Sequence, residues 1–404
     1  MVQAKPLDGV RIVDFSRVMA GPFCTALLAD LGAEVIKVES VAGDDYRHIG
    51  PFKNGESALF LSFNRGKKSI VIDLKADDGR ELAHGLIANS DVVVENFRPG
   101  VARKLGIDYD AARQTNERIV YLSISGFGQA GPLADRPSYD IIAQAMAGMM
   151  DMTGDPAGPP MRVGDALGDL AAGLYGAWGV TAALFGRERT GVGQYVDIAM
   201  FDAIFSFLPT PFAMHMLTGA SPTRSGNSHL LSAPFGSFRA EDGEVIIAVA
   251  NNALFERLLD AVERADLRAD PRFVSDEERK RNELQLRDII ESWTGRHSVE
   301  AVVSRLGEFG VPVSPIWTVE QAATSAHATC RELLARMVHP NAGEIAVIEQ
   351  PVHFSTVPRG ELAPAPQLGE HSRATLRDIL GLDSDRIAAL EAAGTISATD
   401  PPTR

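Results

Sequence analysis

Short β-rich runs alternate with helix-forming segments over the first third of the chain, and this alternation constrains the possible fold more than any other feature. The strand candidates are RIVDF (11–15), EVIKVE (34–39), SIVIDL (69–74), DVVVENF (91–97) and IVYLSISGF (119–127). Between them, GPFCTALLADLG (21–32) and DDGRELAHGLIANS (77–90) carry apolar residues at helical spacing. This succession predicts an α/β fold with a mostly parallel sheet, whose ligands bind at the carboxyl ends of the strands.

The character of the chain changes near residue 220. Before that point, the pattern predicts helices over 139–152 and 166–186 and a strand over 194–200. Beyond it, the segment 221–236 is rich in Ser, Pro and Gly and is followed by a charged, helical stretch to about residue 310. We therefore predict a second, smaller domain in this part of the chain.

The charge balance and the apolar stretches limit the possible partners. With 53 acidic and 39 basic residues, the chain has a formal net charge of −14, which disfavours binding to a nucleic acid or to an anionic membrane. The most apolar stretch, at 203–217, is too short to span a bilayer and contains Pro209 and Pro211. Two cysteines, Cys24 and Cys330, suit a reducing compartment, so we expect the cytoplasm.

Several familiar catalytic and cofactor motifs are missing from the sequence. The turn after the first strand, FSRVMAGPFCT, has a single glycine and no GxGxxG pattern, so no dinucleotide is expected and Glu39 is interpreted as a solvated strand-end acid. HxxxH, CxxC and GxSxG motifs are also missing, which predicts neither a metal site nor a serine hydrolase. We expect no permanently bound cofactor, and a carboxylate remains as the candidate nucleophile.

Two aspartates, Asp165 and Asp169, stand at the start of the apolar helix predicted over 166–186. A carboxylate is ionised at neutral pH and needs no general base to act as a nucleophile, and a helix N-terminus stabilises its negative charge. The alternative is that one aspartate caps the helix and the other is a surface acid, because Asp is a preferred capping residue. The residue types and their spacing leave both interpretations open.

Basic residues cluster near the ends of the predicted strands in this acidic chain. They are Arg65, Lys67, Lys68, Lys75, Arg98, Arg103 and Lys104. Such a cationic rim could hold the phosphates of a nucleotide-bearing ligand, with Arg suited to two-pronged contacts and Lys to a point charge. The alternative is a solvated surface with scattered salt bridges.

Six stretches of the sequence resemble the class III CoA-transferases, the family of formyl-CoA transferase and carnitine CoA-transferase. They are PLDGVRIVDFSRVMAGPFCTALLADLGAEVIKVE (6–39), NRGKKSIVIDLK (64–75), DVVVENFRPGV (91–101), GDALGDLAAGLY (164–175), GQYVDIAMFDA (193–203) and LGEH (368–371). They follow the family's order over nearly the whole chain. In that family the aspartate after LG in the ALGD segment is the nucleophile, and this aspartate is Asp169 here.

The resemblance implies transfer of CoA from an acyl-CoA to a free carboxylic acid. Asp169 would attack the donor thioester to give an aspartyl–acyl anhydride and then an aspartyl-CoA thioester, and water must be excluded while these exist. The implied architecture is an interlocked homodimer, each chain having a Rossmann-like large domain built from both chain ends and a smaller α+β domain. The implied boundaries are 1–205 and 340–404 for the large domain, 225–330 for the small domain, and 206–224 and 331–365 for the linkers.

The resemblance and the cationic rim together predict which residues contact CoA. These are Val18, Ala20, Ile72, Lys75, Asn96, Phe97, Arg98, Arg103, Lys104, Arg136 and Tyr139. Arg47 is a candidate for holding the second carboxylate of a small dicarboxylic acid, with succinyl-CoA as the donor. Met19, Ser40 and Ile49 depart from the formyl-CoA:oxalate branch, which disfavours formyl-CoA and oxalate as substrates.

Two other activities are compatible with parts of the pattern. An α-methylacyl-CoA racemase on the same fold would need an acid/base pair that includes His, but the chain reads SYD at 138–140, with Tyr139 in the position of that His. A catalytically silent protein that binds acyl-CoA or a nucleotide is the other alternative, and the retained Asp169 counts against it.

Overall fold

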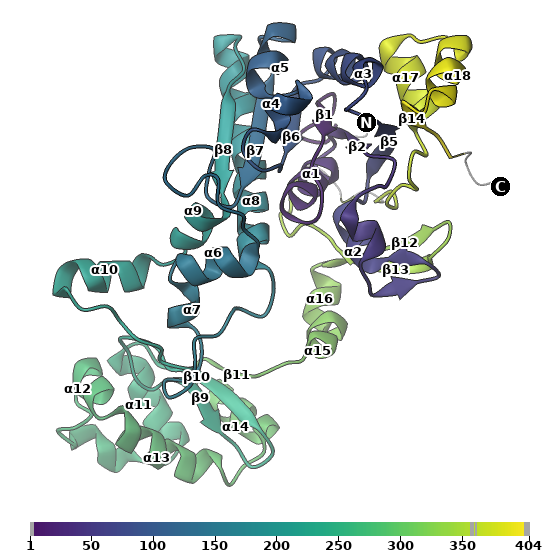
Figure 1. The fold of residues 1–404 in the computed structure, drawn as a ribbon. Helices are drawn as coiled ribbons and strands as arrows, with labels where there is room; N and C mark the ends of the chain where they lie inside the picture. Colours follow the sequence, from purple (N-terminus) through teal and green to yellow (C-terminus); the bar gives the residue numbers. More distant parts are fainter. Residues whose placement is uncertain (1–3, 356–358, 360–361, 400–404) are drawn as a thin grey trace. The chain divides into compact units, whose positions relative to one another are not determined.

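Figure 1 shows a computed structural model of the chain, which describes residues 4–355, 359 and 362–399. The ends of the predicted large domain (1–3 and 400–404) and parts of the second predicted linker (356–358 and 360–361) lie outside these residues. The chain forms two compact units, each with its own hydrophobic core. The first unit comprises Met1–Met149, Arg162–Ala213 and His327–Arg404, and the second comprises Met150–Met161 and Met214–Ala326.

The described residues of the first unit form a seven-stranded sheet in the spatial order β14-β5-β2-β1-β6-β7-β8. Its strands are β1 (Arg11–Asp14), β2 (Glu34–Glu39), β5 (Lys67–Ile72), β6 (Val92–Glu95), β7 (Val120–Ser125), β8 (Tyr195–Ala199) and β14 (Ile396–Ser397). Neighbouring strands from β5 to β8 pair in parallel, and β14 joins β5 antiparallel. The predicted α/β fold with a mostly parallel sheet is therefore confirmed. The chain order reverses between β1 and β6, where ligands of such sheets bind beyond the strand ends.

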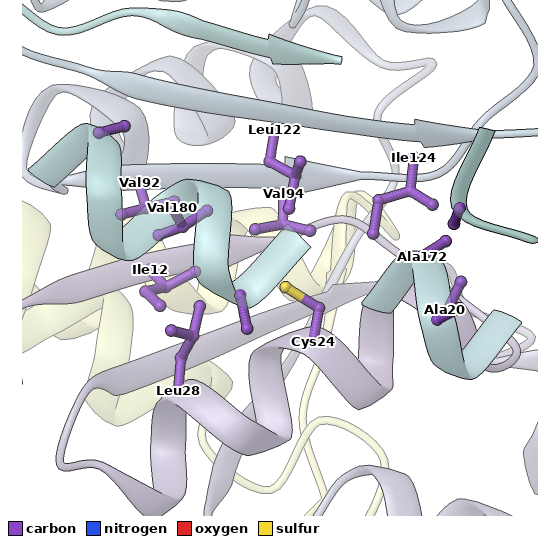
Figure 2. Packing of buried hydrophobic residues seen from close by; sticks show 14 of the residues in the cluster. Ile12, Ala20, Cys24, Leu28, Val92, Val94, Leu122, Ile124, Ala172 and Val180 are labelled. Carbon is purple, nitrogen blue, oxygen red and sulfur yellow. The ribbon is translucent and has the colours of Figure 1, made fainter. Parts of the chain in front are cut away.

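Apolar strand residues fill a core on each face of this sheet, because successive side chains of a strand point to opposite faces. On one face, Ile12, Val94 and Leu122 pack with α1 (Ala20–Asp30) and α8 (Leu167–Thr190), as Figure 2 shows. The helices that share the other core are α3 (Asp77–Ala88), α4 (Val101–Leu105), α5 (Tyr109–Thr115), α17 (Ser372–Leu380) and α18 (Ser384–Ala392).

Helices α1 and α8 pack closely because α8 has glycines where the two helices meet. A Cβ atom on Gly173 would lie 2.7 Å from the carbonyl oxygen of Ala20, and one on Gly176 would lie 3.2 Å from the sulfur of Cys24. Asp169, Gly173 and Gly176 follow one another at helical spacing, so they share one face of α8. This face directs Asp169 toward the N-terminus of α1.

Shorter elements complete the first unit and its connections. They are η1 (Asp45–His48), α2 (Ala58–Phe63), α6 (Asp140–Met146), α7 (Met149–Met152), α9 (Met200–Phe205), α10 (Pro209–Thr218) and α16 (Ala326–Cys330), with the hairpins β3 (Phe52–Lys53) to β4 (Glu56–Ser57) and β12 (Leu334–His339) to β13 (Gly343–Ile348). The segments expected as linkers thus contain regular structure, namely α10 in the first and the β12–β13 hairpin in the second.

The second unit is built around its own small antiparallel sheet. The sheet has the order β11-β10-β9, with β9 (Phe235–Arg239), β10 (Glu244–Ala248) and β11 (Val313–Pro315). Its helices are α11 (Asn252–Ala261), η2 (Ala265–Ala269), α12 (Asp276–Arg281), α13 (Glu283–Thr294), α14 (Val299–Glu308) and α15 (Val319–Thr324). In the part of the chain that the structure describes, none of the helices has the length and apolar character needed to cross a bilayer.

Candidate active site

Asp169 is the third residue of α8 and lies partly buried in the first turn of that helix. The helix begins after Ala166, so neither Asp165 nor Asp169 is its N-cap residue, and the alternative that one of them caps the helix is wrong. The amide of Ala20, the first residue of α1, donates a hydrogen bond to Asp169. The carboxylate therefore lies between the N-terminal ends of two helices, both of which favour a negative charge.

A second carboxylate lies next to Asp169. Asp140, on α6, is 9% exposed and accepts a hydrogen bond from the Gly168 amide at 2.7 Å. Burial and the charge of Asp140 raise the pKa of Asp169 to about 7, while the hydrogen bond from Ala20 lowers it. Full ionisation at neutral pH, expected from the residue type, therefore does not hold. A carboxylate whose anion is less well stabilised is a better nucleophile, because it gives up less stabilising interaction with its surroundings when it forms a bond.

A pocket lined by Asp169 contains most of the predicted CoA contacts, and we term it the nucleophile pocket because Asp169 is the predicted nucleophile. Those that line it are Val18, Ala20, Asn96, Phe97, Arg98, Arg136 and Tyr139. Arg17 also lines it and pairs with Asp45 at 3.1 Å. The pocket thus combines one weakly acidic carboxylate with several guanidinium groups, an arrangement suited to an anionic ligand.

An adjoining pocket, which we term the strand-end pocket, lies beyond β1, β2 and β5. It is lined by Ile72 and Lys75, which were predicted to contact CoA. Arg17 and Phe97 line both pockets, so an extended ligand could occupy the two together. Within the described residues, no group of three or more His, Cys, Asp or Glu side chains could hold a metal ion.

Several residues of the predicted cationic rim lie elsewhere. Arg103 is exposed and pairs with Asp108 at 3.0 Å, and neither Arg103 nor Lys104 lines the two pockets. Arg65 and Lys67 are 3% exposed and form buried ion pairs, so their interpretation as rim residues is wrong. These cations compensate acids inside the fold, and their charges are not available to a ligand.

Arg47, the candidate for a substrate carboxylate, is held by the protein itself. Its guanidinium donates hydrogen bonds to Glu39 at 2.8 and 2.7 Å and lies 3.7 Å from the ring centre of Phe60. Glu39 is only 4% exposed, so its interpretation as a solvated acid is wrong. Arg47 lines neither of the two pockets.

Sequence reasoning missed three residues that shape this site: Arg17, Asp44 and Asp140. Asp44 is fully buried, and its carboxylate accepts a hydrogen bond from the Val18 amide at 3.0 Å. Asp140 ends the SYD segment, whose tyrosine alone was considered. The available signal for the two acids was an Asp at the start of a short helix, since Asp44 is the N-cap of η1 and Asp140 is the first residue of α6.

The comparisons with known proteins decide the family. The model of CoA-transferase family III matches residues 7–372 of the chain. The chain belongs to this family. This family III CoA-transferase is 39% identical to acetyl-CoA:oxalate CoA-transferase of Acetobacter aceti, over 92% of its own length and 95% of the relative. It is 40% identical to succinyl-CoA:mesaconate CoA-transferase of Haloarcula hispanica, over 93% and 96%.

A solved structure agrees with this assignment. The crystal structure of a CAIB/BAIF family protein from Brucella suis matches the family III CoA-transferase with a TM-score of 0.83 and 36% identity, over 93% of this chain and 100% of that one. The predicted resemblance to class III CoA-transferases is confirmed, and the chain is an enzyme of that class.

Proposed function

We propose that this family III CoA-transferase uses Asp169 as its nucleophile to move CoA from an acyl-CoA to a free acid. The observation that carries the proposal is the place of the Asp169 carboxylate. It lines a pocket together with the predicted CoA contacts, and it accepts a hydrogen bond from the Ala20 amide. Its pKa is about 7. No other nucleophile is needed for the reaction.

The proposed steps exchange one thioester without hydrolysing it. The Asp169 carboxylate attacks the donor carbonyl, expels CoA thiolate and forms a mixed anhydride. The thiolate then attacks the aspartyl carbonyl, which releases the donor acid and leaves aspartyl-CoA. The acceptor carboxylate attacks this thioester and expels the thiolate again, and the thiolate takes the acceptor acyl group and frees Asp169. Backbone amides at the two helix N-termini stabilise the oxyanions that form on the way.

The two pockets suggest how CoA lies. The strand-end pocket, with Ile72 and Lys75, would take the nucleotide end, and the nucleophile pocket would take the thioester. Phe97, which lines both, would contact the connecting arm. Arg98, beyond β6, would neutralise phosphate charge.

The acceptor is proposed to be a small dicarboxylic acid and the donor succinyl-CoA. Relatives of the chain are named for oxalate, mesaconate and glutarate. Arg47 lines neither pocket and its partner Glu39 is buried, so Arg136 and Arg17 are the better candidates for the second carboxylate. Both line the nucleophile pocket, and the pair between Arg17 and Asp45 is exposed. Arginine suits this role because it can bind a carboxylate through two parallel hydrogen bonds.

The chain is proposed to function as an interlocked homodimer. Along α8, Leu174, Trp178 and Phe185 are 54%, 68% and 63% exposed. Large apolar side chains gathered on one helix are typical of surfaces that another chain covers. Light scattering of the purified protein tests this, and a monomer at micromolar concentration would exclude it.

Trapping the covalent intermediate tests the proposed chemistry. The enzyme is incubated with succinyl-CoA and hydroxylamine, and the peptide that contains VGDALGDLAAG is analysed by mass spectrometry. Aspartyl-CoA should yield a hydroxamate on Asp169, only when the acyl-CoA is present, and new CoA esters should appear with glutarate or mesaconate as acceptor. A racemase would form no adduct and would place solvent deuterium at the α-carbon of its substrate, which would contradict the proposal.

A further inference from the structure

The turn between β1 and α1 has an unusual backbone conformation. Val18 has φ +68°, in the left-handed region that β-branched residues avoid. Such a conformation persists only where the surrounding structure imposes it, and it is often found at functional sites. Val18 lines the nucleophile pocket, and Ala20, two residues later, donates its amide to Asp169.

Two buried charged residues, Asp44 and Lys37, hold this turn through hydrogen bonds. One carboxylate oxygen of Asp44 accepts hydrogen bonds from the amides of Val18 at 3.0 Å and Tyr46 at 2.9 Å. Its other oxygen lies 2.8 Å from the ammonium of Lys37, and both side chains are fully buried. The Lys37 ammonium also donates to the Ser16 carbonyl at 2.8 Å. The two charges thus bind the turn at both ends.

We propose that Asp44 and Lys37 are positioning residues of the transferase, which fix the β1–α1 turn so that the Ala20 amide meets the Asp169 carboxylate. The proposal rests on the proposed role of Asp169 as the nucleophile. A buried ion pair contributes little to stability compared with apolar residues of the same size, because both charges lose their hydration. This pair instead supplies partners for turn amides and a carbonyl that would otherwise be buried and unpaired.

The pH profile separates a positioning role from a merely structural one. A hydrogen bond to the ionised form lowers the pKa of a carboxylate, so loss of the Ala20 amide raises the pKa of Asp169 and moves the acid limb of kcat/KM to higher pH. Removing the Asp44 charge would act on Asp169 through space in the opposite direction, because the positive charge of Lys37 would then be offset only by Asp14 and Glu39 among the carboxylates that act on it. For Asp44→Asn, a shift to higher pH therefore reports displacement of the turn. Removal of the Lys37 charge acts on Asp169 through space in that same direction, so the profile of Lys37→Met does not separate the two effects.

Other charged and titratable groups also surround Asp169 and set the baseline of this profile. They are Asp140 on α6, Tyr46 in η1, Asp165 before α8, and the pocket residues Arg17, Asp45, Arg98, Arg136 and Tyr139. Each is left unchanged in the variants below, so the shift of the acid limb in Asp44→Asn is attributed to the turn.

The experiment compares Asp44→Asn and Lys37→Met with the control Asp30→Asn. Asp30 pairs with Arg65 in the same unit, with side chains only 3% and 4% exposed, and lines neither pocket. For Asp44→Asn and Lys37→Met, kcat should fall about tenfold or more, because a small misplacement of reacting groups is costly. The KM for acyl-CoA should change less than kcat, and the acid limb should move to higher pH. Asp30→Asn should lower the melting temperature with no movement of the limb.

A rescue variant adds a test of the mechanism. Glycine adopts positive φ readily, so Val18→Gly in the Asp44→Asn chain should recover part of the lost kcat. The proposal would be overturned if the acid limb of kcat/KM lay at the same pH in Asp44→Asn and Asp30→Asn, or if it moved to lower pH in Asp44→Asn. So would failure of all the Asp44 and Lys37 variants to fold, since the pair would then serve folding alone. If the wild type transfers no CoA, or Asp169→Ala retains activity, the proposed function fails instead.

Discussion

Two carboxylates at the carboxyl end of the sheet lie in opposite electrostatic environments. Burial raises the pKa of Asp169, the charge of Asp140 raises it further, and the value reaches about 7. Burial also acts to raise the pKa of Asp44, but Lys37 and the amides of Tyr46 and Val18 outweigh it and hold that pKa below the ordinary value. Both aspartates lie in the first unit and contact the same turn, since Asp169 accepts the Ala20 amide hydrogen and Asp44 accepts that of Val18.

The difference between the two aspartates comes from the partners that the fold gives each carboxylate. Asp44 has an ammonium group and two amides as partners, so its negative charge is strongly stabilised and it serves as a fixed acceptor. Asp169 is placed beside another carboxylate, so its anion is costly and its lone pairs remain reactive. A stabilised carboxylate holds the backbone, and the destabilised carboxylate is the one that we propose as the nucleophile.

The largest expected effect comes from removing the reactive carboxylate. Asp169→Ala and Asp169→Asn should lower the rate of CoA transfer at least about a thousandfold, because neither side chain can form the anhydride. Acyl-CoA binding, measured by calorimetry, should remain within a few fold of wild type. Transfer at a near wild-type rate in either variant would remove Asp169 as the nucleophile.

The same Asp→Asn change should have opposite effects on stability at the two positions. Asp44→Asn should lower the free energy of unfolding by about 3 kcal/mol, because it removes the carboxylate paired with the buried Lys37 ammonium and leaves the charges of Asp14 and Glu39 to offset it. Urea denaturation followed by circular dichroism measures this. A loss below about 1 kcal/mol would show that water or another acid compensates Lys37.

Asp169→Asn should instead stabilise the fold at neutral and higher pH. The pKa of Asp169 is about 7 in the folded chain, whereas an aspartate has an ordinary pKa of 3.8. The folded state therefore binds more protons between those values, and stability falls as pH rises through that window. Asparagine avoids this loss, so the variant should gain about 1–2 kcal/mol at pH 8 and little at pH 4, after allowance for screening of a partly exposed group. Equal stability of the two proteins at pH 8 would contradict the raised pKa.

Much of the fold could be predicted because it depends on local pattern. The β-branched runs became β1, β2, β5, β6 and β7, and the apolar segment with small residues became α8. The close packing of α1 on α8 also has a local cause, since Gly173 and Gly176 lie on the face that carries Asp169. These features need only periodicity and residue size, which a single sequence displays.

The charges could not be placed in the same way. Glu39, Arg65 and Lys67 all have the residue types of a solvated surface, yet all three are almost fully buried. Their partners are distant in sequence, as in the pair between Lys67 and Asp14, 53 residues apart. A charged side chain is usually buried only when the fold places such a partner beside it. Which partner lies beside it depends on the order of the strands in the sheet, and the local pattern does not encode that order.

A smaller effect is expected at Asp140, the carboxylate next to Asp169. Asp140→Asn removes the negative charge that raises the pKa of Asp169. The amide oxygen of the new side chain can still accept a hydrogen bond from the Gly168 amide. The acid limb of kcat/KM should therefore move to lower pH, by about half a unit or more. Initial rates from pH 5 to pH 9 measure the limb. An unchanged limb would show that burial alone sets the pKa of Asp169.

The smallest effect is expected at Asp165, the other aspartate of the same segment. It is exposed, it precedes the helix, and its carboxylate accepts only the neighbouring Ala166 amide at 2.7 Å among the hydrogen bonds that the structure describes for that side chain. Because Ala166 holds the N-cap position, Asp165→Ala removes no cap, and we expect a stability loss of about 0.5 kcal/mol or less. Activity should stay within about twofold, because the side chain lines neither pocket. The test is a direct comparison with Asp169→Ala in the same assay. A loss of activity as large as that of Asp169→Ala would show that both aspartates, and not one, take part in the transfer of CoA.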